Sequence, residues 1–390
     1  MIIEEIKLKS FRNYDSLTLR PHPGVNILFG PNGVGKTNLL EAVHYCALGR
    51  SHRTGQDREA VMKDRPAGAI GITLRRSEGR HEIALKLTPE EARKKQIFID
   101  RKKGSRLSGL MGQLQVVIFS PEDLLLVKEG PALRRRFLDM LLSQLSTGYF
   151  VALQQYQKAL EQRNTLIREG RKTGSCSPAM LDSFEQAMAG PAEAIIRSRR
   201  WAAEQLSSLA AEKYRVVSGR DEETFGITYR CCLEEQELTA QRFLESLRAS
   251  RQQDLFRGTT CFGPHREDLL FTLKDREMKL FASQGQIRTA ALSLKLSQMA
   301  LFRQKTGESP VLLLDDVMSE LDMSRRTRLL QEIGTVQTFI TCTDESDLEG
   351  CREKRSYRVT TDEQGFAAIR EISSGEAAEE EKWEDLDFLT

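Results

Sequence analysis

The sequence of 390 residues predicts an α/β protein in which a strand-rich head is interrupted by an inserted helical hairpin. Three observations lead to this prediction. Short strands separated by turns fill the first third of the chain. Leu, Ala, Gln, Glu and Arg then follow at helical spacing from about residue 124 to residue 217. Alternating strand and helix patterns return after residue 259, and a chain of this length has room for two or three domains.

The head begins with strands. Apolar residues alternate with polar ones over residues 2–8 and 17–19, with turns between and after these segments. The segment VNILF, residues 25–29, runs directly into a glycine-rich loop, and the segment after that loop has helical spacing. Further apolar segments between residues 68 and 119 predict more strands.

The glycine-rich loop has the form G-x-x-x-x-G-K-T, and its place between a strand and a helix is the context in which such loops bind phosphate. The glycines let backbone N–H groups converge on a β-phosphate, Lys36 neutralises the β- and γ-oxygens, and Thr37 offers a hydroxyl to Mg²⁺. We therefore expect ATP and Mg²⁺ as cofactors. The expected ATP contacts in this segment are Gly30, Pro31, Asn32, Gly33, Val34, Gly35, Lys36, Thr37 and Asn38.

A second motif, PVLLLDD at residues 310–316, places two carboxylates directly after an apolar run. Such a run suits a strand buried on both faces, and ligands of α/β sheets bind at the carboxyl ends of the strands. We expect Asp315 to hold Mg²⁺ together with Thr37. Asp316 and Lys36 are the expected catalytic residues, with Asp316 orienting the attacking water. The alternative is a strand that ends in a solvated acidic turn.

A third motif, ASQGQIR at residues 282–288, opens the helix before that acidic strand. A serine at a helix start is commonly an N-cap, which is one interpretation of Ser283. The other is a second anion site, since helix N-termini bind anions. The first loop already holds the chain's own phosphates. Ser283, Gly285 and Gln286 would therefore contact nucleotide bound to a second copy, in an ATP-dependent homodimer.

The insertion consists of two long helical halves joined by GRKTGSCSP, as in an antiparallel helical hairpin. The dipeptide Gly190-Pro191 predicts a kink or a break in the second half. The expected domains are a discontinuous head at 1–120 and 260–375 and a helical insertion at 121–259. An acidic tail at 376–390 is expected to be disordered.

The charge of the chain is unevenly distributed. The last fifteen residues hold seven acids and one lysine, so the rest of the chain carries a net charge of +8 against +2 for the whole. A basic body with an acidic tail suits a nucleic-acid binder. The seven cysteines show no C-x-x-C pair, no apolar run approaches the ~18 residues of a membrane span, and the N-terminus lacks signal-peptide features. We expect a cytoplasmic protein with reduced thiols and no membrane partner.

The order of these motifs resembles the ATP-binding-cassette ATPases, specifically their SMC-like branch with coiled-coil insertions. The phosphate loop is followed by a long helical insertion, S-x-G-Q, the acidic strand and SELD at residues 319–322. Within that branch, LKSFRNY, FGPNGVGKTNLLEAV, GPHRED, ASQGQ and PVLLLDD make the chain similar to the RecF family of bacterial recombination-repair proteins. The similarity extends to about residue 345 and implies an ABC-type P-loop ATPase head.

This resemblance implies an ATP-dependent dimer that binds DNA in recombinational repair and replication. It also implies action with RecR and RecO-like mediators at single-strand gaps and duplex junctions, where the recombinase is loaded and the SOS response is induced. We expect weak, DNA-stimulated ATPase activity that serves as a switch. One alternative is a transporter ATPase subunit, which the polar hairpin of about ninety residues disfavours. The other is a cassette ATPase that regulates a partner enzyme such as a nuclease.

The chain departs from the wider cassette family at three positions. Asp316 stands where most members have glutamate, Thr343 stands where a histidine is common, and Glu122 lies where a glutamine is usual. The roles of Thr343 and Glu122 are therefore left open. The shorter Asp316 side chain predicts slow hydrolysis.

Candidates for DNA contact are the basic stretch 92–106, the arginines 134–136, and His52 with Arg53. Each has an ordinary alternative. Lysines on an exposed strand edge prevent aggregation, an arginine on a helix can face the core, and His52 or Arg53 can pair with acids. Trp383, Leu386 and Phe388 in the tail either dock to a partner or have no such role.

Overall fold

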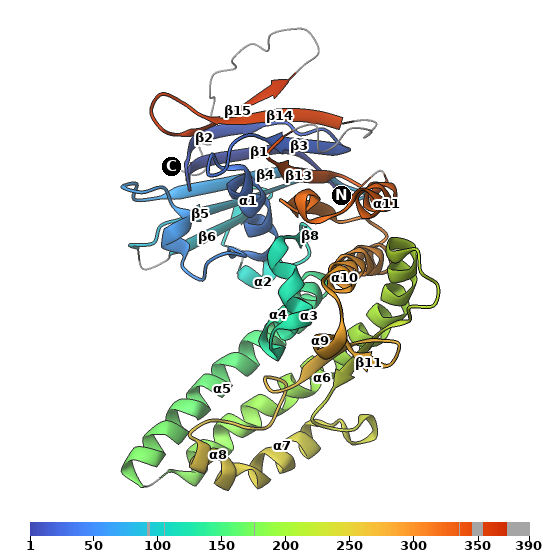
Figure 1. Cartoon of the computed structure of the whole chain (residues 1–390). Helices are drawn as coiled ribbons and strands as arrows, with labels where there is room; N and C mark the ends of the chain where they lie inside the picture. Colours follow the sequence, from blue (N-terminus) through green and yellow to red (C-terminus); the bar gives the residue numbers. More distant parts are fainter. Residues whose placement is uncertain (92–93, 105, 175, 335, 345–353, 373–390) are drawn as a thin grey trace. The chain divides into compact units, whose positions relative to one another are not determined.

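A computed structural model describes residues 1–91, 94–104, 106–174, 176–334, 336–344 and 354–372 (Figure 1). The chain divides into two compact units, residues 1–123 with 298–390 and residues 124–297. The expected acidic tail lies outside the described residues. Within the described parts of the chain, no helix has the length and apolar character needed to cross a membrane.

The first unit contains a six-stranded sheet whose order is β15-β14-β3-β13-β12-β8. Neighbours from β14 to β8 pair in parallel, and only β15 is antiparallel. The strands are β3 (Val25–Phe29), β8 (Val116–Phe119), β12 (Val311–Asp315), β13 (Thr338–Cys342), β14 (Lys354–Thr361) and β15 (Ala367–Ile372). Every residue of β3, β8, β12 and β13 is buried, as parallel strands covered on both faces require.

A second, antiparallel sheet of the same unit has the order β2-β1-β4-β5-β6-β7. Its strands are β1 (Ile2–Phe11), β2 (Tyr14–Leu19), β4 (Gly68–Arg76), β5 (Gly79–Leu87), β6 (Lys95–Ile99) and β7 (Lys102–Lys103). Helix α1 (Lys36–Leu48) contacts strands of both sheets and is buried along nearly its whole length. The unit is completed by η1 (Asp57–Ala60), α2 (Leu107–Leu110), η4 (Met318–Glu320) and α11 (Met323–Ile333).

The second unit is mainly helical. Its longest helices, α5 (Thr147–Thr173) and α6 (Pro178–Ser218), pack side by side as the expected hairpin (Figure 1). Helix α6 continues through Pro191 without a break. The other helices are η2 (Pro121–Leu124), which spans the boundary, α3 (Leu125–Lys128), α4 (Pro131–Leu145), η3 (Glu235–Glu237), α7 (Ala240–Ala249), α8 (Arg251–Arg257), α9 (Met278–Phe281) and α10 (Gln284–Thr306), which continues into the first unit.

The second boundary between the units lies at residues 297/298, whereas the sequence pattern predicts it at 259/260. The difference comes from strand pairing. Strand β10 (Asp268–Leu273) does not join a sheet of the head. It pairs with β9 (Phe225–Arg230) and β11 (Arg276–Glu277) in a separate antiparallel sheet of the second unit. An apolar pattern predicts a strand but not the strand with which it pairs. Residues 260–297 therefore belong to the second unit and not to the head.

Candidate active site

The phosphate loop joins β3 to α1, and its glycines are required by close backbone approaches. A side chain at Gly30, where φ is +148°, would place its Cβ 2.2 Å from the carbonyl oxygen of Val359. At Gly35, where φ is +118°, the Cβ would lie 2.8 Å from Oδ1 of Asn13. Only glycine meets both conditions, because L-residues rarely adopt this backbone conformation. The loop is therefore held tightly against β14 and the turn between β1 and β2.

The Lys36 ammonium lies inside the phosphate loop and bonds to its backbone. It donates hydrogen bonds to the carbonyl oxygens of Gly30 at 2.6 Å and Pro31 at 2.7 Å. Burial lowers the pKa of Lys36, while the nearby Asp316 carboxylate acts in the opposite direction. The charge thus lies within the curve of the loop, where the β- and γ-phosphates of a nucleotide are bound in loops of this kind.

Thr37 and Asp315 meet as the two motifs predict. The Thr37 hydroxyl donates to Oδ1 of Asp315 at 2.8 Å, although 278 residues separate them. They meet because β13 alone lies between β3 and β12 in the sheet. A hydroxyl and a carboxylate are hard oxygen ligands of the kind that Mg²⁺ prefers. This pair therefore fits the expected metal site.

Thr341, at the end of β13, was not singled out by the sequence motifs. Its hydroxyl donates to Oδ1 of Asp315 at 2.8 Å and accepts from the backbone N–H of Asp316 at 2.9 Å. It is buried and fixes both acidic residues at once. The pattern of β13 predicts a strand, but only the pairing register of Asp315 with Thr341 places this hydroxyl in the site.

Asp316 has a left-handed backbone with φ of +54°. Its side chain is exposed directly after the carboxyl end of β12. Partial desolvation and the neighbouring Asp315 carboxylate raise the pKa of Asp316. Its carbonyl oxygen accepts a hydrogen bond from the Ser319 hydroxyl at 2.9 Å. Asp316 therefore lies exposed beside the expected metal site, and its role in orienting water stays a prediction.

Asn38 lies in the first turn of α1, where an inner layer of polar residues supports the loop. Its side-chain amide donates to Oδ1 of Asn13 at 2.8 Å, and the Asn13 amide donates to the carbonyl of Val34 at 3.0 Å. The Tyr14 hydroxyl donates to the carbonyl of Gly35 at 3.0 Å. The turn between β1 and β2, which the sequence marked only as a turn, therefore braces the phosphate loop.

Glu41 is the centre of a second supporting network. It is fully buried and accepts two hydrogen bonds from the guanidinium of Arg12, at 2.9 and 2.6 Å, and one from the Ser51 hydroxyl at 2.5 Å. Arg53 lies 3.7 Å from the same carboxylate and donates to Oδ1 of Asn38 at 3.0 Å. Arg53 thus pairs with an acid. The sequence does contain a signal for this network, which is a glutamate within an apolar helix. A buried carboxylate requires a cationic partner, so an arginine near Glu41 could have been expected.

Ser283 belongs to the second unit, where it caps α10. Its hydroxyl accepts from the backbone N–H of Gln286 at 3.3 Å, and the Gln286 side chain accepts from the N–H of Ser283 at 3.0 Å. The Gln286 amide also donates to Glu223 at 3.1 Å. This reciprocal pair is a capping box, so the simpler interpretation of Ser283 holds. Ser283 is nevertheless exposed and Gly285 is partly so, which leaves the contact with a second copy as a prediction.

Thr343 and Glu122, the other two positions that depart from the cassette family, are on the surface as Asp316 is. Thr343 follows β13 and is exposed. Glu122 is exposed too, in a short turn where the N–H of Ser120 bonds to Asp123 at 2.8 Å. In the segment SELD, Asp322 caps α11 by accepting from the N–H of Arg325 at 2.9 Å.

Several candidate DNA contacts have structural roles. Lys95 donates to the carbonyl of Gly49 at 2.5 Å and lies 3.1 Å from Asp57. Arg134 is buried and forms two hydrogen bonds with Asp268, at 2.7 and 2.9 Å. These side chains hold segments of the fold together. Among the described residues of these candidates, the other exposed basic side chains are Lys94, Arg101, Lys102, Lys103, Arg106 and Arg136, of which Arg101 lies 3.0 Å from Glu82.

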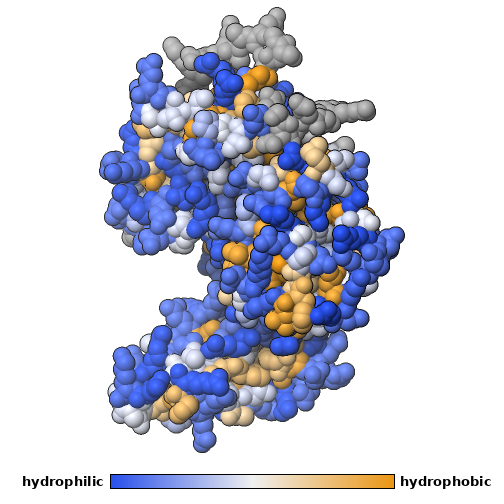
Figure 2. All heavy atoms as spheres, in the orientation of Figure 1, coloured by the Kyte–Doolittle hydropathy of each residue, from blue (hydrophilic) through white to orange (hydrophobic). Residues whose placement is uncertain are grey.

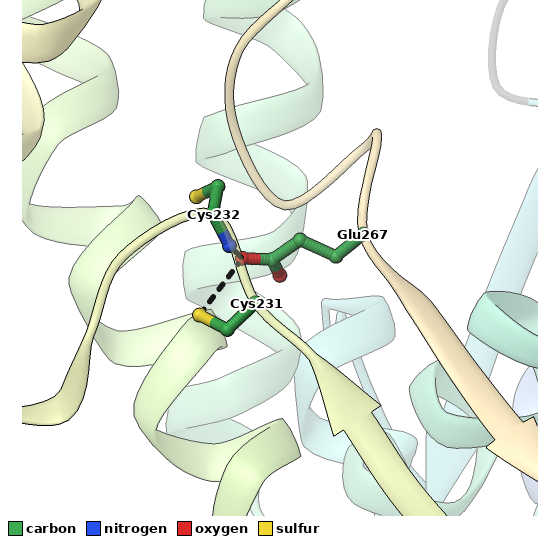
Figure 3. A group of neighbouring side chains, drawn as sticks. All are labelled: Cys231, Cys232 and Glu267. Atoms are coloured by element: carbon green, nitrogen blue, oxygen red, sulfur yellow. Dashed lines mark hydrogen bonds between the residues drawn. The ribbon is translucent and has the colours of Figure 1, made fainter.

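Cys231, Cys232 and Glu267 form a compact group in the second unit (Figure 3). The Cys231 thiol donates to Oε1 of Glu267 at 3.2 Å, and the backbone N–H of Cys232 donates to the same oxygen at 3.0 Å. The other oxygen accepts from the Tyr229 hydroxyl and lies 3.9 Å from Arg199. Both carboxylate oxygens therefore already have partners within the unit, so the group serves to anchor β9 to the segment before β10.

Comparisons with known proteins find similarity over nearly the whole chain. The family model for the RecF/RecN/SMC N terminal domain matches residues 2–368. The DNA replication and repair protein RecF of Ruminiclostridium cellulolyticum is 40% identical over 352 residues, covering 88% of this chain and 93% of that protein. The protein of the same name from Acetivibrio thermocellus is 41% identical over 354 residues, covering 90% of this chain and 95% of that protein.

Two solved structures illustrate the structural similarity. The structure of the recombination mediator protein RecF-ATPrS in the RecFOR pathway has a TM-score of 0.86 and 32% identity, covering 95% of this chain and 98% of that chain. The Smc head domain of Pyrococcus furiosus with an extended coiled coil has a TM-score of 0.54 and 14% identity, covering 95% of this chain and 96% of that chain. The second similarity concerns the fold alone.

Proposed function

This chain belongs to the RecF family within the RecF/RecN/SMC proteins, and from that premise we propose that it is an ATP-dependent DNA-binding protein of recombinational repair and replication. It acts with RecR and RecO-like mediators at single-strand gaps and duplex junctions, where it promotes recombinase loading and SOS induction. The observation that supports this most is the meeting of Thr37, Asp315 and Thr341 beside the loop that holds Lys36.

ATP would bind with its phosphates in the curve of the loop. Lys36 would then exchange the carbonyls of Gly30 and Pro31 for phosphate oxygens. When bound, Mg²⁺ supplies charge neutralisation to the β- and γ-phosphates, and Thr37 with Asp315 would hold it. Asp316, which is exposed directly after β12, orients the attacking water.

Dimerisation would bring the Ser283 loop of one copy to the nucleotide of the other. Leu280 and Phe281, directly before this loop, have exposed fractions of 67% and 60%, and hydrophobic residues gather around α9 and α10 (Figure 2). In the first unit, Met323 follows the SELD segment and is 71% exposed. Exposed apolar residues beside both segments are typical of a surface that is covered in a complex.

Hydrolysis serves as a switch in this proposal. Phosphoryl transfer depends on positioning, and small displacements of the group that orients water are costly. Asp316 is one methylene shorter than the usual glutamate, and Thr343 lacks the reach of a histidine. Both differences weaken control of the water while they leave ATP binding intact, so the dimer persists between turnovers.

Sedimentation velocity with Mg·ATP tests the dimer. We expect wild type to dimerise and Ser283→Arg to remain monomeric while it still binds ATP. Ser177→Arg is the matched control, because Ser177 also caps a helix, α6, and has no role in the proposed interface. A wild type that stays monomeric, or equal loss in both variants, contradicts the proposed arrangement.

Binding to gapped, single-stranded and duplex DNA tests the function itself. Each substrate is titrated with no nucleotide, with ATP and with a nonhydrolysable analogue. We expect ATP and the analogue to strengthen binding, since the dimer doubles the basic surface that faces the DNA. Affinity that is unchanged by nucleotide for every substrate would exclude an ATP-switched DNA binder and favour regulation of a partner enzyme.

A further inference from the structure

We propose that the hairpin end of the second unit carries a separate binding site for single-stranded nucleic acid. The site is a pocket of about 500 Å³ formed where the end of α5 meets α8 and the segment after it. Its lining residues are Arg171, Phe256, Arg257, Thr259, Cys261 and Arg266. None of them belongs to the nucleotide site.

Positive charge dominates this pocket. A second hollow of about 610 Å³ shares Arg171 and Arg257 with the first and adds Arg168, Lys172 and one acid, Glu169. Among the residues that the structure describes, Arg171, Lys172 and Arg257 have no ion-pair partner, and all are exposed. Unpaired guanidinium groups around a hollow favour a ligand with several phosphates, because each group offers forked donors to phosphate oxygens.

Phe256 adds a surface for stacking. Its side chain is 82% exposed, which is the highest exposure among the large apolar residues described in this chain. It lies beside Arg257 at the end of α8 and lines the basic pocket. Proteins that bind single strands combine a basic groove with aromatic rings on which bases stack. An acidic peptide would use the arginines but would leave the ring uncovered, and a duplex keeps its bases stacked inside.

The wall of the pocket is held in place by a buried polar network. Asp254 is fully buried and accepts from Arg163 at 2.8 Å and from the backbone N–H of Cys261 at 2.8 Å. Thr260 accepts from Arg163 at 2.7 Å and donates to Asn164 at 2.7 Å. These bonds tie the segment 259–261 to α5 and α8, so the groups that would contact a ligand are positioned before it binds.

Helix C-termini offer an ordinary explanation for part of this charge. Arg171 and Lys172 lie in the last turn of α5 and Arg257 lies in the last turn of α8, where cations offset the helix dipole. This accounts neither for Arg266, which comes from a loop, nor for the exposed ring of Phe256. Arg266 is itself oriented by two hydrogen bonds to the carbonyl of Thr260, at 3.0 and 2.8 Å.

The test uses the full chain and labelled oligo(dT), with a duplex of equal length and with poly-glutamate as competitor. Arg171→Gln/Arg257→Gln should weaken oligo(dT) binding about tenfold at low salt and reduce the log–log salt slope by about 1.4. Phe256→Ala should weaken it about fivefold or more, and Phe256→Trp should retain affinity. Arg197→Gln/Arg242→Gln is the control, since it removes equal charge from arginines paired with Glu193 and Glu237. Circular dichroism checks that each variant folds.

The proposal is overturned if Arg171→Gln/Arg257→Gln and Phe256→Ala bind oligo(dT) like wild type, if the control loses as much affinity, or if poly-glutamate displaces oligo(dT) efficiently. That DNA is the ligand rests on the proposed function, and the two are separated by the duplex measurements with Mg·ATP. If the wild type binds duplex in an ATP-dependent way and the pocket variants still bind oligo(dT) normally, only the site at the hairpin end is excluded. A wild type that binds no DNA in any state removes both.

Discussion

Asp316 is the residue whose chemistry sets the rate of ATP turnover in this proposal. Asp316→Asn keeps the side-chain shape, and asparagine tolerates the left-handed backbone at this position. We expect ATP binding to be retained and turnover to fall by about 100-fold or more, from a wild-type rate below ~10 s⁻¹. Asp275→Asn, at an exposed left-handed turn residue, is the control. Steady-state hydrolysis and nucleotide titration decide the matter, and normal turnover in the variant would remove Asp316 from the mechanism.

His265 makes the stability of the second unit depend on pH. Its Nδ1 accepts from the Tyr156 hydroxyl at 2.7 Å, its Nε2–H donates to the carbonyl of Thr260 at 3.0 Å, and burial lowers its pKa to about 4. The unfolded chain therefore takes up a proton at a higher pH than the folded one. Stability is present above about pH 6.5 and is lost as the pH falls towards 4, by about 2–3 kcal/mol.

His265→Gln keeps one hydrogen-bond acceptor and one donor at this position and cannot become charged. Urea unfolding of wild type and variant at pH 7 and pH 5 measures the difference, followed by Trp201 fluorescence in a Trp383→Phe background where Trp201 is the only tryptophan. The wild type should lose more stability than the variant between these two values. Equal losses would show that other groups cause the acid sensitivity.

Helices α5, α6 and α8 are joined by buried charges. Arg163 is fully buried between Glu185 and Asp254, at 2.9 and 2.8 Å. Asp254→Asn removes one of its two anionic partners and should reduce the free energy of unfolding by about 3–5 kcal/mol, as breaking a buried pair does. Asp182→Asn is the control on the same helices, because Asp182 is 40% exposed where it pairs with Arg251. There we expect a much smaller loss, because water screens an exposed ion pair.

Urea titrations of both variants, read by Trp201 fluorescence, give the two values. Similar losses would mean that the buried network contributes no more than a surface pair. If Asp254→Asn is largely unfolded at room temperature without urea, its loss of unfolding free energy is larger than expected, and the buried network contributes more than a surface pair.

The whole molecule should unfold in two steps, since each unit has its own core. Mg·ATP should raise the stability of the first unit by about 2.7 kcal/mol at a hundredfold excess over its Kd. Far-UV circular dichroism follows both units, whereas Trp201 follows the second alone. In the Ser283→Arg background, which is expected to be monomeric, nucleotide should leave the Trp201 transition unchanged. A single coincident transition for both probes would contradict independent units.

The charge of the whole chain gives a further expectation. Ending the chain after residue 375 raises its net charge from +2 to +8. This truncation should strengthen DNA binding at low salt and make it more salt-dependent, because more phosphate contacts release more counterions. Gel shifts at two salt concentrations measure both effects. Unchanged affinity would mean that the tail's charge does not compete for the DNA-binding surface.

Local sequence patterns were enough to predict the parts of the protein whose functional residues are neighbours along the chain. The phosphate loop, the acidic strand and the two long helices of the hairpin follow from residues that are neighbours along the chain, so local spacing and apolar pattern were sufficient. The meeting of Thr37 with Asp315 was also predictable, because both motifs have a known place at the ends of parallel strands.

The distant residues that support this chemistry could be identified only from the folded chain. Thr341 between the two acids, Arg12 on Glu41, and the pairing of β10 with β9 all join segments that have no local signal for each other. The same holds for Arg134, whose basic side chain forms an ion pair with Asp268. A charged residue or an apolar run in the sequence indicates that a partner of a certain kind is required. Many pairings satisfy the same local pattern, so the packing of the whole chain determines which partner is used.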